Sequence, residues 1–269
     1  MAKLTIRGLE TNVEVWNESA EQVIVALHGF TGSTATWRNL ASSLPNVRVV
    51  AIDCIGHGKT AVPAEVSRFS MEEQLQDLEE IFTQLNLENF TLLGYSMGGR
   101  IALSYAIAYP ERIEKLILES ASPGLRTSEE RIERCQKDNM LADKIGMNGI
   151  PSFVDAWEKI ALFESQKRLP ESVQHMIRTE RLAQCEAGLA GSLRGIGTGM
   201  QPSNWPYLAD LAVPVLLITG SIDEKFCQIA IEMLALLKNA QHVTVNDVGH
   251  AIHVENPAEF ATIVEKYLM

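Results

Sequence analysis

The strongest candidate for a catalytic residue in this sequence is a serine with a glycine two positions away on each side. It lies in Gly94-Tyr95-Ser96-Met97-Gly98, which fits the pattern Gly-x-Ser-x-Gly. The motif follows an apolar run at 90–94 and precedes a stretch with helical spacing at 99–109. A serine on such a sharp turn presents its hydroxyl above the sheet, and small neighbours are needed because the backbone crowds there. Ser96 is therefore the predicted catalytic serine, and the alternative is a tight turn whose serine only caps the helix.

Two partners for this serine are expected at later strand ends. A serine hydroxyl becomes a good nucleophile or base only when an imidazole accepts its proton and a carboxylate orients that imidazole. Asp223 follows the apolar run 214–219, and His250 follows the run 242–246. Glu224 and Asp247 compete for the acidic role, but Asp223 lies on a turn that can aim it at the site. The predicted triad is Ser96, Asp223 and His250.

The other five histidines are assigned no proton transfer. His175 lies in a polar helical region, and His242 lies at the start of a strand. His253 lies three residues after His250, and His28 and His57 lie in glycine-rich turns. An oxyanion hole is predicted from the backbone N–H groups of Phe30, in His28-Gly29-Phe30-Thr31-Gly32, and of Met97, the residue after the serine. Phe30 can also be read as a simple apolar wall residue.

The elements that must position these groups alternate along the first part of the chain. Apolar runs rich in β-branched residues at 23–27, 47–52, 90–94 and 115–119 predict buried strands. A helical stretch at 70–85, capped by Ser70, is typical of the segments between them. Alternating strands and helices favour an α/β fold with a mostly parallel sheet. The segments 4–6 and 13–16 are expected to form an antiparallel start.

The alternation stops between residues 124 and 208, where polar, helix-favouring segments contain no convincing strand. It resumes with a strand at 214–219, a helix at 225–237, a strand at 242–246 and a helix after Asn256. The sequence therefore predicts an α/β core of residues 1–123 and 209–269, with a helical cap insertion of residues 124–208.

Composition limits the class of protein. The 269 residues are 46% hydrophobic and carry 23 Lys and Arg against 34 Asp and Glu, a net charge of −11. This composition excludes a disordered chain, and the acidic balance argues against nucleic acid or membrane as a partner. The four cysteines lie far apart, so neither disulfides nor a zinc site is expected. Without an apolar leader or a membrane-length apolar run, the prediction is a cytoplasmic protein with no metal and no cofactor.

Several motifs together resemble the α/β-hydrolase superfamily, over nearly the whole chain. They are His28-Gly29-Phe30, Gly56-His57-Gly58, the serine motif with Gly99, and Gly249-His250. One departure is Ile55, which stands where the family's turn has proline. Proline would restrict the φ angle of that turn, so the change affects loop rigidity more than chemistry.

Further stretches are similar to one lyase family of menaquinone biosynthesis within this superfamily. They are residues 94–100, 122–125, 130–134, 155–157 and 223–226. Enzymes of that family eliminate pyruvate from an enolpyruvyl cyclohexene precursor that carries three carboxylates. The resemblance implies that Ser96 acts as the base, and it assigns substrate binding to Tyr95, Arg100, Arg134, Trp157 and Arg178. Arg131 is a weaker candidate.

The distribution of charge agrees with a small anionic substrate. A planar guanidinium pairs with a carboxylate through two parallel hydrogen bonds. Arg100 lies four residues after Ser96, one helical turn away, and can reach the same pocket. Residues 124–208 contain seven Arg and four Lys against eleven acidic residues. The cap is therefore neutral, and an acidic protein can still present a cationic pocket.

Two other functions remain open at this stage. The same triad could serve a carboxylesterase or a C–C bond hydrolase through an acyl-serine intermediate. A non-enzymatic binding protein of the same fold is the third class, although it would not need an intact triad. The sequence is compatible with a monomer or a small homo-oligomer.

Overall fold

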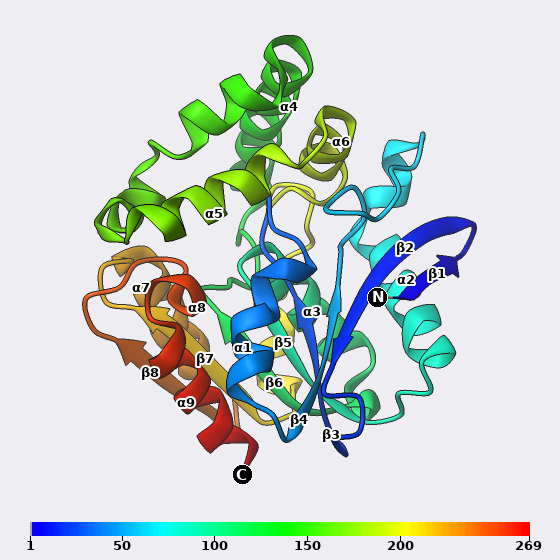
Figure 1. The fold of residues 1–269 in the computed structure, drawn as a ribbon, viewed down its shortest axis with the longest axis vertical. Helices are drawn as coiled ribbons and strands as arrows, with labels where there is room; N and C mark the ends of the chain where they lie inside the picture. The colour runs from blue at the N-terminus through cyan, green and yellow to red at the C-terminus, as the bar shows by residue number, and fades with distance from the viewer. Residues whose placement is uncertain (1) are drawn as a thin grey trace.

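The computed structural model describes residues 2–269, and its centre is one eight-stranded sheet (Figure 1). The strands are β1 (Ala2–Ile6), β2 (Leu9–Trp16), β3 (Gln22–Leu27), β4 (Val47–Ile52), β5 (Phe90–Tyr95), β6 (Ile113–Glu119), β7 (Val215–Gly220) and β8 (Ala240–Val245). Their order is β1-β2-β4-β3-β5-β6-β7-β8. Only the pairs β1–β2 and β2–β4 are antiparallel among these described strands. The predicted α/β fold with a mostly parallel sheet is confirmed.

Both faces of the sheet are buried, which explains why its strands are continuous apolar runs. In β3, Val25 and Leu27 belong to the core on one face, whereas Ile24 and Ala26 belong to the core on the other. Successive side chains of a strand point to opposite faces, so a strand covered on both sides must be apolar throughout.

Helices cover the two faces. One face packs against α2 (Met71–Gln84), α3 (Met97–Ala108) and α7 (Glu224–Leu234), and the other against α1 (Arg38–Ser43), α8 (Ile252–Glu255) and α9 (Pro257–Leu268). Ser70 caps α2 as expected, accepting a hydrogen bond from the N–H of Glu73 at 3.3 Å. Helix α7 ends three residues before its predicted limit, and β8 begins two residues earlier than predicted.

Three longer helices lie between β6 and β7 and gather at the top of Figure 1, above the end of the sheet. They are α4 (Ser128–Trp157), α5 (Glu171–Leu182) and α6 (Glu186–Ile196). Helix α4 is kinked at Gly149, whose φ is 78°, just before Pro151. Helices α4 and α6 share a separate apolar cluster. The division of the chain at residues 124 and 208 stays a prediction. No helix within residues 2–269 combines the length and apolarity needed to span a bilayer.

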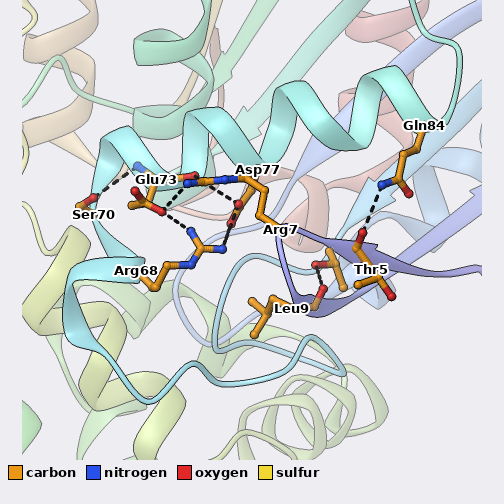
Figure 2. A network of polar contacts seen from close by, with 9 residues as sticks. Thr5, Arg7, Leu9, Arg68, Ser70, Glu73, Asp77 and Gln84 are labelled. Atoms are coloured by element: carbon orange, nitrogen blue, oxygen red, sulfur yellow. Dashed lines mark hydrogen bonds and ion pairs between the residues drawn. The ribbon is translucent and has the colours of Figure 1, made fainter.

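A polar network joins the first hairpin to α2 (Figure 2). Arg7, in the β1–β2 turn, and Arg68 both pair with Glu73 and Asp77 of α2. The two Nη2 contacts from Arg68 to the carboxylate oxygens of Asp77 measure 3.0 and 3.1 Å. Asp77 is only 6% exposed, so its carboxylate depends on these donors in place of water.

We expect the Arg68→Ala substitution to lower the free energy of unfolding by about 1–3 kcal/mol, because a buried carboxylate then keeps only Arg7. Urea denaturation of parent and variant measures the change. Lys3→Ala is the control, since it breaks an exposed ion pair with Glu10 whose contribution is about 0–1 kcal/mol. Equal effects of the two substitutions would contradict the role given to this network.

Candidate active site

Ser96 occupies the sharp turn between β5 and α3, with φ 50° and ψ −105°. This conformation is strained for a residue with a side chain and costs about 1–3 kcal/mol, which the surrounding structure must offset. A Cβ on Gly94 would lie 2.4 Å from the Gly98 carbonyl oxygen, and one on Gly98 would lie 2.2 Å from the Leu27 carbonyl oxygen. Both glycines are therefore required by close backbone contact.

The structure brings the three predicted triad residues together from three strand ends. The distance from His250 Nε2 to Ser96 Oγ is 3.0 Å, and from His250 Nδ1 to Asp223 Oδ2 it is 2.6 Å. Asp223 ends the turn after β7 and also caps α7 through the N–H of Phe226. His250 is 1% exposed and Asp223 is 9% exposed.

This geometry determines which imidazole nitrogen carries the proton. The Asp223 carboxylate can only accept, so Nδ1–H donates to it and Nε2 is left to accept the Ser96 hydroxyl proton. When the proton moves to Nε2, the buried carboxylate stabilises the resulting imidazolium. The arrangement can therefore generate a strongly basic or nucleophilic serine oxygen.

A second buried pair, absent from the sequence prediction, holds the loop that carries His250. The Glu119 carboxylate accepts from the backbone N–H and from Nδ1 of His253, at 3.0 and 2.8 Å. The Glu119 carbonyl oxygen accepts the Ser96 N–H at 2.9 Å. Glu119 thus binds both the serine turn and the histidine loop. The available signal was an acidic residue directly after the apolar run 116–118 of that strand.

The two residues predicted to form the oxyanion hole both contribute to the cavity beside the triad. Phe30 and Met97 line the same cavity as Ser96 and His250. Neither backbone N–H takes part in the turn, loop and cap hydrogen bonds found within residues 2–269. The assignment of these two N–H groups to an oxyanion hole stays a prediction.

A cavity of about 590 Å³ lies over the triad, between the sheet and the cap helices. Its lining combines apolar side chains with four cationic ones, Arg100, Arg134, Lys137 and Lys225, and one carboxylate, Asp138. An excess of positive charge in a partly enclosed cavity favours anionic ligands. Among the described residues, no group of three or more His, Cys, Asp or Glu is placed to hold a metal ion.

Arg100 is buried beneath this cavity without a carboxylate partner among residues 2–269. Its Nη1 donates to the Ile196 carbonyl oxygen at 2.9 Å and to Gln201 Oε1 at 2.8 Å. Burial, with the nearby charge of Arg134, lowers its pKa to about 10, so the guanidinium remains protonated at neutral pH. A buried cation held by neutral acceptors can bind a carboxylate strongly.

The other predicted binding residues of the cavity are Tyr95, Arg134 and Trp157. Arg134 Nε donates to Asp138 at 2.8 Å, which leaves the rest of its guanidinium for a ligand. Trp157 Nε1 is buried and has no hydrogen-bond partner in the described part of the chain. The Trp157 ring meets Phe30 edge to face, with centroids 5.6 Å apart.

The expectation for Arg178 needs correction, because the structure does not bring it to this cavity. Its guanidinium binds Asp155 and Glu158, each at 2.6 Å, and its side chain is 37% exposed. The buried arginine of α5 is Arg181, whose guanidinium lies over the Phe163 ring at 4.5 Å. The two arginines differ by three positions, and only the docking of α5 decides which of them faces inward.

Lys137 and Lys225 were missed as lining residues. Lys137 lies one helical turn after Arg134, so the face of α4 that carries Arg134 could have indicated it. Lys225 lies two residues after Asp223, within a stretch that the sequence already singled out. Arg131, the weaker candidate, does not line the cavity.

The comparisons with known proteins agree with this fold and site. The family model for the alpha/beta hydrolase fold matches residues 22–257. An esterase from Thermogutta terrifontis has a TM-score of 0.86 at 24% identity, over 99% of this chain and 97% of that one, which supports the fold alone. The chain belongs to the alpha/beta hydrolase family.

Several relatives show which enzymes of this family the chain resembles. It is 48% identical to a Bacillus subtilis protein provisionally named 2-succinyl-6-hydroxy-2,4-cyclohexadiene-1-carboxylate synthase, over 93% of this chain and 91% of the relative. The identity to the synthase of Pectobacterium atrosepticum is 31%, over 91% and 93%. The solved structure of MenH from S. aureus has a TM-score of 0.91 at 39% identity, over 96% and 97%. Within the alpha/beta hydrolases, the chain therefore groups with the 2-succinyl-6-hydroxy-2,4-cyclohexadiene-1-carboxylate synthases.

Proposed function

We propose that this protein is a carbon–oxygen lyase that eliminates pyruvate from 2-succinyl-5-enolpyruvyl-6-hydroxy-3-cyclohexene-1-carboxylate. The product is 2-succinyl-6-hydroxy-2,4-cyclohexadiene-1-carboxylate, the compound in the name of its relatives. The observation that carries the proposal is a hydrogen-bonded Ser-His-Asp triad under a cavity with four cationic side chains. The substrate carries three carboxylates, which such a cavity suits.

The reaction begins with proton removal from ring carbon 2, next to the succinyl carbonyl. Ser96 Oγ takes this proton while its own proton moves to His250 Nε2, and Asp223 stabilises the imidazolium. The negative charge develops on the carbonyl oxygen. The N–H groups of Phe30 and Met97 stabilise it there.

Elimination then follows through the ring. The electrons of the enolate turn the single bond between carbons 2 and 3 into a double bond. The former 3,4 double bond moves to carbons 4 and 5, and the bond from carbon 5 to oxygen breaks. The leaving group is the enolate of pyruvate, which takes up a proton and becomes pyruvate. No acyl-enzyme forms. Ser96 keeps the ring proton as its hydroxyl proton, and the imidazolium of His250 gives its proton to the departing enolate, which returns the triad to its starting state.

The carboxylates of the substrate hold it in this position. Arg100 from below and Arg134 from the cap are assigned to carboxylates, and Tyr95 and Trp157 form the walls beside the ring. A neutral ester pocket is mostly apolar, so the cationic lining favours the lyase over the alternative esterase or C–C bond hydrolase. A cytoplasmic location and a monomeric or small oligomeric state are parts of this proposal.

The test is release of pyruvate from authentic substrate by purified protein without added metal or nucleotide. We expect turnover that saturates with substrate, and slow hydrolysis of neutral p-nitrophenyl esters by the same preparation. Fast ester hydrolysis without pyruvate release would support the acyl-serine alternative. A folded protein that does neither would overturn both enzymatic proposals.

A further inference from the structure

Lys225 is one of the four cationic side chains that line the cavity. Neither the triad mechanism nor the family resemblance assigns it a role. It is exposed at the start of α7 and lines the cavity with Ser96 and His250. Arg134 and Lys137 each pair with a carboxylate, Asp138 and Glu133. Lys225 forms no ion pair with any carboxylate of residues 2–269. Lys225 and Arg100 are thus the two lining cations without an ion pair to a carboxylate of residues 2–269.

The position of Lys225 is unfavourable for the helix that carries it. The amino-terminal turn of a helix has a partial positive charge and stabilises acidic side chains there, so a lysine in the second position of α7 is opposed by the dipole. A residue that breaks a local rule at the edge of a cavity indicates a functional requirement. The Asp223 carboxylate caps this helix terminus, and Lys225 is the cation that the first turn of α7 adds to the lining of the cavity.

The neighbours of Lys225 connect it to the reacting groups. Its Nζ lies 5.7 Å from the centroid of the Phe226 ring, and that ring meets His250 with centroids 4.6 Å apart. The short segment 223–226 therefore carries the triad acid, the lysine and the ring that packs on the catalytic histidine. Lys225 and His250 thus share Phe226 as a neighbour, and both line the cavity.

The order of the strands separates Lys225 from the oxyanion hole. Strand β3, which precedes Phe30, lies on one side of β5, whereas β7, which precedes Lys225, lies on the other side. With the succinyl carbonyl on ring carbon 2 directed toward Phe30, the opposite ring carbon, carbon 5, is directed toward β7. Carbon 5 carries the leaving enolpyruvyl group, whose carboxylate then faces Lys225.

Resting on the proposed function, we propose that Lys225 binds the carboxylate of the leaving pyruvate unit. An ammonium at this place positions the leaving group, and it stabilises the enolate that departs, because the charge on that fragment increases as the bond from carbon 5 breaks. Lys225 is thus a specificity-determining residue on the leaving-group side. Arg100 and Arg134 remain for the two carboxylates that stay with the ring.

The Lys225→Gln variant tests this assignment. We expect kcat/KM for pyruvate release to fall by about 10- to 100-fold. The constant for inhibition by added pyruvate should rise by at least about fivefold, while inhibition by succinate changes less than about twofold. The Lys225→Arg variant should recover most of the affinity for pyruvate, because the charge is kept.

Lys238→Gln is the matched control, since it removes the same charge from an exposed lysine that lies after α7 and outside the cavity. Lys225→Gln kinetics equal to those of this control, or pyruvate inhibition unchanged or absent, would overturn the assignment while leaving the lyase in place. A parent protein that releases no pyruvate would overturn the proposed function and the assignment together.

Discussion

The Ser96→Ala variant is expected to lose pyruvate release by roughly 10³- to 10⁶-fold in kcat. In the proposed mechanism the Ser96 oxygen takes the ring proton, and His250 Nε2, 3.0 Å away, accepts the hydroxyl proton of the serine. Without the hydroxyl, the histidine has no relay to the substrate, and the remaining rate comes from binding and the oxyanion hole. Single-turnover measurement of pyruvate release gives the change in the chemical step.

The triad also predicts how two substitutions combine. Ser96 and His250 act as one unit, so the double variant Ser96→Ala/His250→Ala should be about as slow as either single variant. The free energy of unfolding should change by less than about 1 kcal/mol in Ser96→Ala, because the serine side chain is small and partly exposed. Ser42→Ala, on an exposed helix surface, is the control for folding. Losses that multiply in the double variant would contradict a shared mechanism.

Arg100→Met is expected to reduce kcat/KM for the anionic substrate by about 10²-fold, equivalent to about 2.7 kcal/mol of transition-state stabilisation. Arg100 is buried and protonated at neutral pH, and it donates hydrogen bonds only to neutral acceptors, Ile196 and Gln201. Its positive charge is therefore available to a substrate carboxylate. Methionine keeps much of the volume but provides no donor. Steady-state kinetics of pyruvate release, with a thermal unfolding curve for each variant, separate binding from stability.

The matched control for this variant is Arg194→Gln. Arg194 lies in the cap, pairs with Asp143 at 2.5 Å, and does not line the cavity over the triad. Its loss should change kcat/KM by less than about twofold. A neutral p-nitrophenyl ester should be hydrolysed at nearly the same rate by the parent and by Arg100→Met. Equal loss of ester and lyase activity would instead indicate a general structural defect.

The groups nearest the chemistry were predictable because local sequence determines their geometry. The glycines around Ser96 specify a strand-to-helix turn that a Cβ would block, and the apolar runs specify strands buried on both faces. In a parallel sheet, the carboxyl ends of the strands lie at one edge. Asp223 and His250 follow two such ends, so their approach to Ser96 could be predicted before any distance was measured.

The residues that needed the tertiary structure are those whose direction depends on how helices dock. Arg178 and Arg181 share α5. The exposed Arg178 pairs with Asp155 and Glu158 at 2.6 Å, whereas the buried Arg181 lies against Phe163 and is 3.7 Å from Glu158. Helical spacing alone describes faces of a helix without saying which one turns inward. Docking of the cap on the core makes that choice.

The sequence by itself determined the fold, the serine turn and the order of Ser96, Asp223 and His250 along the chain. These follow from backbone rules that act within a few residues and from the regular alternation of strands and helices. Only the tertiary structure decided that Glu119 holds the loop of His253 and that Lys225 belongs to the cavity. These contacts join segments far apart in the chain, and their formation depends on packing, for which local sequence carries no direct signal.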